Sequence, residues 1–153
     1  MLKTFFNTDG NITSLILRVV AGLVMFPHGA QKLLGWFGGY GFTGTLGFFT
    51  DKMGVPAIIA ILVILCESLG SLALIAGFAT RFMAAGLATV MLGAVIMVHT
   101  GNGFFMNWSG KQAGEGFEYH ILLIGICAAL VISGAGKWSV DRWILPRLPK
   151  ASV

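Results

Sequence analysis

The chain contains very little charge. Only 10% of its 153 residues are Asp, Glu, Lys or Arg, 56% are hydrophobic, and the mean hydropathy is +0.86. A soluble domain usually carries about a quarter charged residues, because it must cover its surface with polar groups. Ten basic and six acidic side chains are too few for a protein of this size. The composition therefore excludes an ordinary soluble domain and predicts an integral membrane protein.

Several other signatures are missing from the sequence. Cys66 and Cys127 lie inside apolar runs without CxxC or Cys/His spacing, which favours buried thiols over a disulfide or a zinc site. No nucleotide-binding fingerprint is present, so in any redox reaction a flavin or a second subunit would have to supply the reducing equivalents. The region before residue 12 lacks a short apolar run with a cleavage site, so we expect the first apolar segment to be retained.

Four apolar runs are long enough to cross a bilayer as helices: about 12–34, 55–78, 82–99 and 117–134. The turn at 77–81 is tight, which predicts that the second and third helices are antiparallel neighbours. The other two connections are long and rich in glycine and aromatic residues, as is typical of loops at the membrane surface. We therefore predict an all-α integral membrane protein, a single domain over residues 1–153 folded as a four-transmembrane-helix bundle.

The distribution of Lys and Arg predicts the orientation. Cytoplasmic segments carry an excess of these residues. The N-terminal region, the tight turn and the C-terminal tail hold six of them: Lys3, Arg81, Lys137, Arg142, Arg147 and Lys150. The two long loops hold Lys52 and Lys111. Both termini are expected in the cytoplasm, and the short basic tail is not the extended surface that a nucleic acid would require. An amphipathic stretch at 42–53 is expected at the interface, with Phe48, Phe49 and Met53 facing lipid.

The first apolar segment carries charge on one face. At about 100° per residue, Arg18, Gly22, Gly29 and Lys32 share that face, and glycines allow close helix packing. His28 lies at its edge, beside the Pro27 kink. Arg18 is too deep to reach the headgroups, so we expect it to have a partner. Lys32 has the alternative of extending its ammonium group to the membrane surface.

The second apolar segment has one carboxyl group, Glu67, on a face with Ala60, Ser71 and Leu74. A carboxyl group at this depth is neutral, ion-paired or in contact with a polar ligand. One alternative is an Arg18–Glu67 pair that only fixes helix register.

The last two segments supply further candidates. Glu118 aligns with Gly125 and Ala129, and His120 points about 200° away, so Glu118 is the preferred candidate. His99 ends the third segment, where the alternative is an interfacial histidine without a partner. His28, Lys32, His99 and Glu118 are thus expected at the outer end of the bundle. Arg18 and Glu67 are expected deeper, continuing an outward-opening polar pocket suited to ligand binding or proton handling.

These residues also follow a family pattern. The matching stretches are Arg18…Gly22…His28-Gly29-Ala30-Gln31-Lys32-Leu33, Glu67-Ser68-Leu69-Gly70…Gly77-Phe78-Ala79-Thr80-Arg81, His99…Gly103-Phe104-Phe105, Glu118-Tyr119 and Gly134-Ala135-Gly136-Lys137-Trp138-Ser139-Val140-Asp141. In their order and spacing the chain resembles the DoxX-like membrane proteins, which are related to the membrane subunit of thiosulfate:quinone oxidoreductase. The resemblance implies a four-helix bundle in the bacterial inner membrane and, for some members, electron transfer to quinone.

The leading hypothesis is a quinone-linked oxidoreductase subunit with a soluble redox partner. Arg18, His28, Lys32 and His99 would bind the ligand, and Glu67 and Glu118 would transfer protons. Met25, Phe26, Trp36 and Phe104 or Phe105 would form the apolar slot. The alternatives are a haem or metal site at His28 and His99, a non-catalytic anchor or partner-binding subunit, and a proton-coupled transporter. Glycine faces also make a homo-oligomer plausible.

Overall fold

The structure is a computed structural model that describes residues 6–147. Lys3 and Lys150, which entered the orientation argument, lie outside this range. Within the described residues every regular element is helical and there is no strand, which confirms the predicted all-α class.

Each predicted segment forms a helix. The first is α2 (Ile12–Leu34), and the second runs without a break through α4 (Ala57–Leu65), η3 (Cys66–Gly70) and α5 (Ser71–Ala76). The third comprises α6 (Thr80–Ala94), η4 (Val95–His99) and η5 (Thr100–Asn102), and the fourth is α7 (Glu118–Ser133). The shorter elements are η1 (Trp36–Gly38), α3 (Gly41–Gly47), η2 (Phe48–Lys52), α8 (Val140–Ile144) and η6 (Leu145–Arg147).

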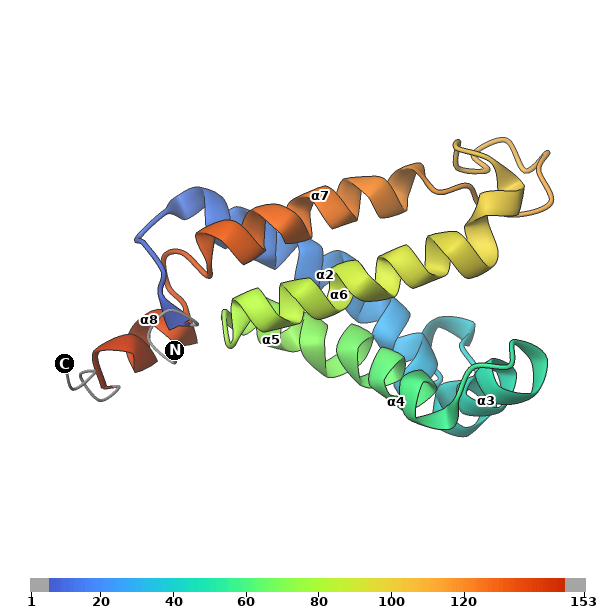
Figure 1. The fold of residues 1–153 in the computed structure, drawn as a ribbon, viewed down its shortest axis with the longest axis horizontal. Helices are drawn as coiled ribbons and strands as arrows, with labels where there is room; N and C mark the ends of the chain where they lie inside the picture. Colours follow the sequence, from blue (N-terminus) through green and yellow to red (C-terminus); the bar gives the residue numbers. More distant parts are fainter. Residues whose placement is uncertain (1–5, 148–153) are drawn as a thin grey trace.

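Three of these helices are long and apolar enough to cross a membrane. They span residues 12–34, 57–76 and 80–102, with 23, 20 and 23 residues. The fourth, α7, is apolar but has only 16 residues. It packs along α6 and also contacts α2, so the four helices lie side by side (Figure 1).

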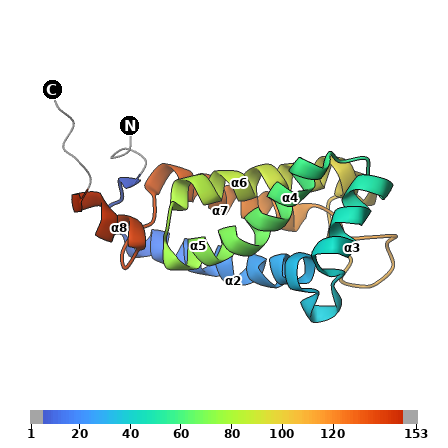
Figure 2. The same cartoon turned by 90° about the horizontal axis from the view of Figure 1, so that it is seen from below.

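The two ends of the molecule differ. α8 and the first described residues lie at one end, which we call the terminal end (Figures 1 and 2). The segment containing α3 and the loop at 103–117 lie at the other, the loop end. Arg81, at the start of α6, and Arg142, in α8, therefore occupy the terminal end, whereas the segments with Lys52 and Lys111 are at the loop end.

The predicted packing face of α2 is confirmed. Its buried residues include Arg18, Gly22, Met25 and Gly29. A Cβ atom added to Gly29 would lie 2.4 Å from the carbonyl oxygen of Glu67, and one added to Gly22 would lie 2.7 Å from that of Ser71. Since real Cβ atoms do not approach so closely, only glycine allows α2 to pack directly on the backbone of the second helix.

Arg18 does not pair with Glu67, and that alternative is wrong. Its guanidinium group donates only to backbone carbonyls within the described structure, and the side chain is 1% exposed. The acceptors are the carbonyls of Leu74 (3.2 Å), Ile75, Ala135 (2.9 Å), Lys137 (3.1 Å) and Trp138 (2.7 Å). Arginine has five N–H donors in a rigid plane, which suits a ring of carbonyls at the ends of helices. Arg18 thus ties α2 to the end of α5 and to the segment before α8.

The predicted packing face of α7 is wrong. The buried residues of this helix are His120, Leu123, Cys127 and Leu130, whereas no atom lies within 4 Å of a Cβ added to Gly125. The larger apolar side chains bury more surface against α6 and α2, so they face the core, and the small-residue face with Gly125 points outward.

Replacing Gly29 by alanine should destabilise the protein, whereas Gly125→Ala should not. The Gly29 substitution forces α2 away from η3 and should cost about 1–3 kcal/mol by overpacking. Thermal unfolding of both variants in detergent tests this difference. Equal midpoints for the two variants would contradict the close packing of α2.

Candidate functional site

Glu67 lies in a distorted part of the second helix. Residues Cys66–Gly70 form a π-helical turn between α4 and α5. Such turns interrupt the regular hydrogen-bond ladder and are frequent at functional sites. The hydroxyl groups of two serines stabilise the turn, because Ser68 donates to the Ile64 carbonyl (2.6 Å) and Ser71 to that of Ser68 (2.7 Å). The turn presents the Glu67 carboxylate, 4% exposed, toward α2.

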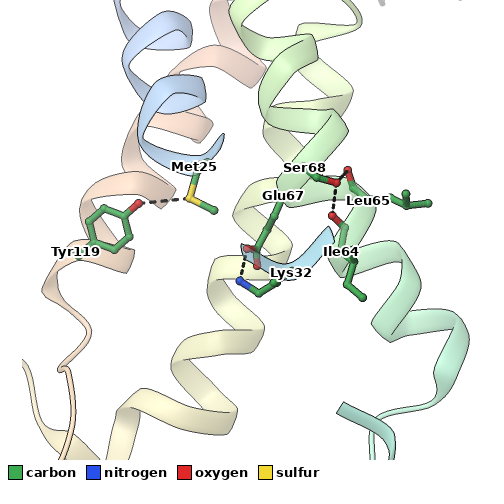
Figure 3. Close-up of polar contacts among 7 residues, drawn as sticks. All are labelled: Met25, Lys32, Ile64, Leu65, Glu67, Ser68 and Tyr119. Atoms are coloured by element: carbon green, nitrogen blue, oxygen red, sulfur yellow. Dashed lines mark hydrogen bonds and ion pairs between the residues drawn. The ribbon is translucent and has the colours of Figure 1, made fainter. Parts of the chain in front are cut away.

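The partner of Glu67 is Lys32. The ammonium nitrogen of Lys32 lies 2.5 Å from Oε2 of Glu67, and the two side chains are 25% and 5% exposed (Figure 3). Gly29 is one turn before Lys32, and its contact with the Glu67 backbone brings the two side chains into range. Lys32 is in the last turn of α2, where the helix dipole favours a cation. The ammonium group therefore points to a buried carboxylate and not to the membrane surface.

This ion pair lies in the wall of a large cavity. The cavity has a volume of about 1160 Å³ and is bounded by α2, the second helix, α6 with η4, the start of α7 and η2. Figure 1 shows α4 and α6 diverging toward the loop end, and the lining at that end includes His99 and Glu115. Most of the lining is apolar. Several of its apolar members are also exposed: Ile59, Leu62, Leu69, Phe82 and Met97. The accessible wall of the cavity is therefore largely apolar.

Methionine is concentrated in this wall. Every methionine of the described chain lines the cavity: Met25, Met53, Met83, Met91, Met97 and Met106. Thioether side chains are flexible and polarisable, and they make favourable contacts with aromatic rings. The hydroxyl group of Tyr119 donates to the sulfur of Met25 at 3.3 Å (Figure 3). Such a wall is adapted to a flat ring or a flexible chain.

Four rings follow one another along the cavity. The centroids of His28 and Tyr119 are 6.3 Å apart, those of Tyr119 and His120 are 5.5 Å apart, and those of His120 and His99 are 4.1 Å apart. Nδ1 of His99 lies 2.8 Å from the carbonyl oxygen of Glu115. Nδ1 of His120 is buried and has no hydrogen-bond partner among the described residues. All four rings line the cavity, and we call them the ring series.

The structure brings together four of the six predicted site residues. His28, Lys32, Glu67 and His99 line the cavity, whereas Arg18 is at the terminal end. Of the residues predicted to form the apolar slot, only Met25 lines it. Phe48, Phe49 and Met53, which were expected to face lipid, also line the cavity.

Glu118 has a different place from the one predicted. Its Oε1 accepts hydrogen bonds from the backbone N–H of Met106 (2.9 Å) and the indole N–H of Trp108 (3.3 Å), and it does not line the cavity. Glu118 therefore holds the loop and does not line the cavity, whereas His120 does, and the proton-transfer role of Glu118 stays a prediction. The two residues do point in different directions, but the core lies on the His120 side. The apolar residues Leu123, Cys127 and Leu130 share one helical face with His120, and this spacing could have indicated which side of α7 faces the core.

The described residues contain no group of three or more His, Cys, Asp or Glu side chains placed to hold a metal ion. His28 and His99, the predicted alternative ligands for haem or metal, lie at opposite ends of the ring series.

Known proteins resemble the chain along most of its length. A family model described as DoxX matches residues 13–100. The chain belongs to the DoxX family.

The chain is 32% identical over 138 residues to "Putative oxidoreductase CatD" of Bacillus subtilis (strain 168), covering 90% of this chain and 91% of CatD. It is also 32% identical over 128 residues to the inner membrane protein YqjF of Escherichia coli (strain K12), covering 84% of this chain and 88% of YqjF. The inner membrane protein YphA of the same organism is 25% identical over 131 residues, covering 84% and 87%. No solved structure matches the chain. This DoxX protein is thus a membrane protein with bacterial relatives.

Removing one partner of the Lys32–Glu67 pair should destabilise the protein more than removing both. Lys32→Met or Glu67→Gln leaves one buried group without its partner, at a cost of about 1–3 kcal/mol once the partial exposure of Lys32 is considered. The double variant leaves no uncompensated charge. Unfolding midpoints of the four proteins give a double-mutant cycle, and strictly additive effects would argue against the pair.

Proposed function

We propose that this DoxX protein is an inner-membrane subunit of a quinone-linked oxidoreductase and that quinone binds in the cavity beside Lys32 and Glu67. The observation that carries the proposal is a cavity of about 1160 Å³ that combines a largely apolar wall with a buried ion pair. Ligand sites typically combine apolar walls with a few placed polar groups. The name of CatD, an oxidoreductase with similar length, supports a redox function.

The chemistry of a quinone fits this arrangement. Its carbonyl oxygens accept hydrogen bonds, and Lys32 supplies an ammonium donor whose charge is balanced by Glu67. Methionine side chains contact the ring, and an isoprenoid tail lies along the apolar lining, where Leu62 and Phe82 are 57% and 63% exposed. A lipid-soluble ligand can then enter from the bilayer.

Electrons must come from outside this chain. Reduction of a quinone to a quinol takes two electrons and two protons, and the sequence has no nucleotide-binding fingerprint. We therefore infer that a soluble partner with a reduced flavin supplies the electrons. Glu67 is the acid group nearest to the bound carbonyl in this proposal and takes part in proton transfer.

Quinone binding can be tested directly. Purified wild-type protein should carry extractable quinone or bind decylubiquinone, and Lys32→Met should lower the affinity about tenfold or more, because a charge-assisted hydrogen bond is worth about 1.5–3 kcal/mol. The Lys32→Met/Glu67→Gln double variant is the matched control for folding, and it should also bind weakly. A folded wild-type protein that binds no quinone would contradict the proposal and favour a membrane anchor.

The proposal includes a fourth transmembrane helix and cytoplasmic termini. α7 is about 24 Å long at 1.5 Å per residue, and the aromatic residues before it can extend the crossing to the headgroups. Green fluorescent protein fused after residue 153 should fluoresce, and alkaline phosphatase inserted in the loop at 103–117 should be active in the periplasm. The reverse pattern of reporter activity would overturn this orientation.

A further inference from the structure

The polar groups of the cavity are not evenly distributed. At the terminal end Arg18 is 1% exposed and bonded to five carbonyls, and Leu74, Leu87 and Leu130 fill the interior. The cavity lining nearest that end, at Leu69, Phe82 and Met83, is apolar. The exposed carboxylate of the lining, Glu115, lies in the loop at 103–117, so a path from the cavity to water is expected toward the loop end.

The ring series leads in that direction. It begins at His28, one helical turn before Lys32, and continues through Tyr119 and His120 to His99. His99 is half-buried, and its neighbour Glu115 is exposed in the loop. Successive rings are neighbours, with centroids 4.1–6.3 Å apart, and a proton would pass between their polar atoms through bridging water in the cavity. Each of the four rings carries a group that can both donate and accept a proton.

The hydrogen bond of His99 determines which of its nitrogens is free. The Glu115 carbonyl can only accept, so Nδ1 of His99 must donate its hydrogen to it. In the neutral ring Nε2 is then unprotonated and can take up a proton, while the Nδ1–H bond is kept. His120 lies against this ring and is 7% exposed, with one buried nitrogen that has no partner among residues 6–147.

We propose that the ring series His28–Tyr119–His120–His99 conducts protons between the cavity and the loop end of the protein. This inference rests on the proposed quinone reaction. His99 takes up a proton at Nε2 from hydronium at the loop end and passes it to His120, and Tyr119 accepts a proton from His120 as it releases its own to His28. When the quinone accepts two electrons from the reduced flavin of the partner, the His28 imidazolium gives this proton to a carbonyl oxygen, so that an N–H bond breaks and an O–H bond forms. A second such transfer completes the quinol and leaves each ring in its starting protonation state.

Other titratable groups border this path. Lys32 and Glu67 face the His28 end from α2 and η3, and Glu115 and Glu118 flank the His99 end. The thiols of Cys66 and Cys127 lie on η3 and α7, toward the apolar core. The ring series connects the ion pair to His99 and the exposed Glu115 through groups that line the cavity.

The rate of proton-coupled quinone reduction tests the proposal. Wild-type protein in lipid nanodiscs would be loaded with decylubiquinone and reduced by a mediator-coupled electrode, which replaces the flavin as electron source. His99→Ala should lower the reduction rate about 10–100-fold, because general acid–base groups contribute roughly 10²–10⁴-fold. Free imidazole should restore the rate, since it can occupy the vacated position. A loss caused only by misfolding would not respond to imidazole.

Matched variants separate the possible outcomes. Tyr119→Phe and His120→Gln should also slow the reduction, whereas Phe42→Leu should not, because Phe42 lies outside both the ring series and the cavity lining. Decylubiquinone binding is measured for every variant. If the variants bind quinone and are reduced at the wild-type rate, or if imidazole has no effect on His99→Ala, the proton path is wrong. If wild-type protein binds no quinone, the proposed function fails as well.

Discussion

The direct contact between the backbones of α2 and the second helix determines most of this structure. Gly22 and Gly29 allow it, and any side chain at Gly29 would overlap the Glu67 backbone. Because the helices are so close, the short distance from Lys32 to Glu67 follows, and two charges that would each be costly in a bilayer compensate one another. α4 and α6, by contrast, diverge toward the loop end, and the cavity occupies the space between them.

The two ends of the bundle have separate physical roles. At the terminal end a single arginine is bonded to carbonyls from two segments far apart in sequence, and the Asp141 carboxylate accepts the backbone N–H groups of Ala79 and Thr80 at 2.6 and 2.9 Å. These contacts hold the ends of four segments together. At the loop end the polar side chains are distributed around a cavity and face its interior. Backbone-directed hydrogen bonds thus hold one end together, and the charged and titratable side chains of the cavity lie toward the other.

The packing around the glycine residues also bears on the predicted homo-oligomer. Gly22 and Gly29 are occupied by packing within the chain, so they are not available to a second copy. The face of α7 that carries Gly125 is not covered within the described chain. The prediction of a homo-oligomer therefore rests on this face. The same difference explains why the glycine pattern predicted the packing of α2 correctly and that of α7 incorrectly. A small residue permits close approach, but it does not require a neighbour.

The sequence by itself determined the membrane class, the positions of the four helices and the inward face of α2. These depend on hydrophobicity and helical period, which are local properties. It also predicted one polar region made of His28, Lys32, Glu67 and His99 together with Arg18 and Glu118, and the last two lie elsewhere. Only the tertiary structure decided that Glu67 pairs with Lys32 and that Arg18 binds carbonyls, because the depth of a charge does not identify its partner. Likewise, the packing of α6 and α2 against α7 decided which side of α7 faces the cavity. That packing also fixed the positions of Tyr119 and His120.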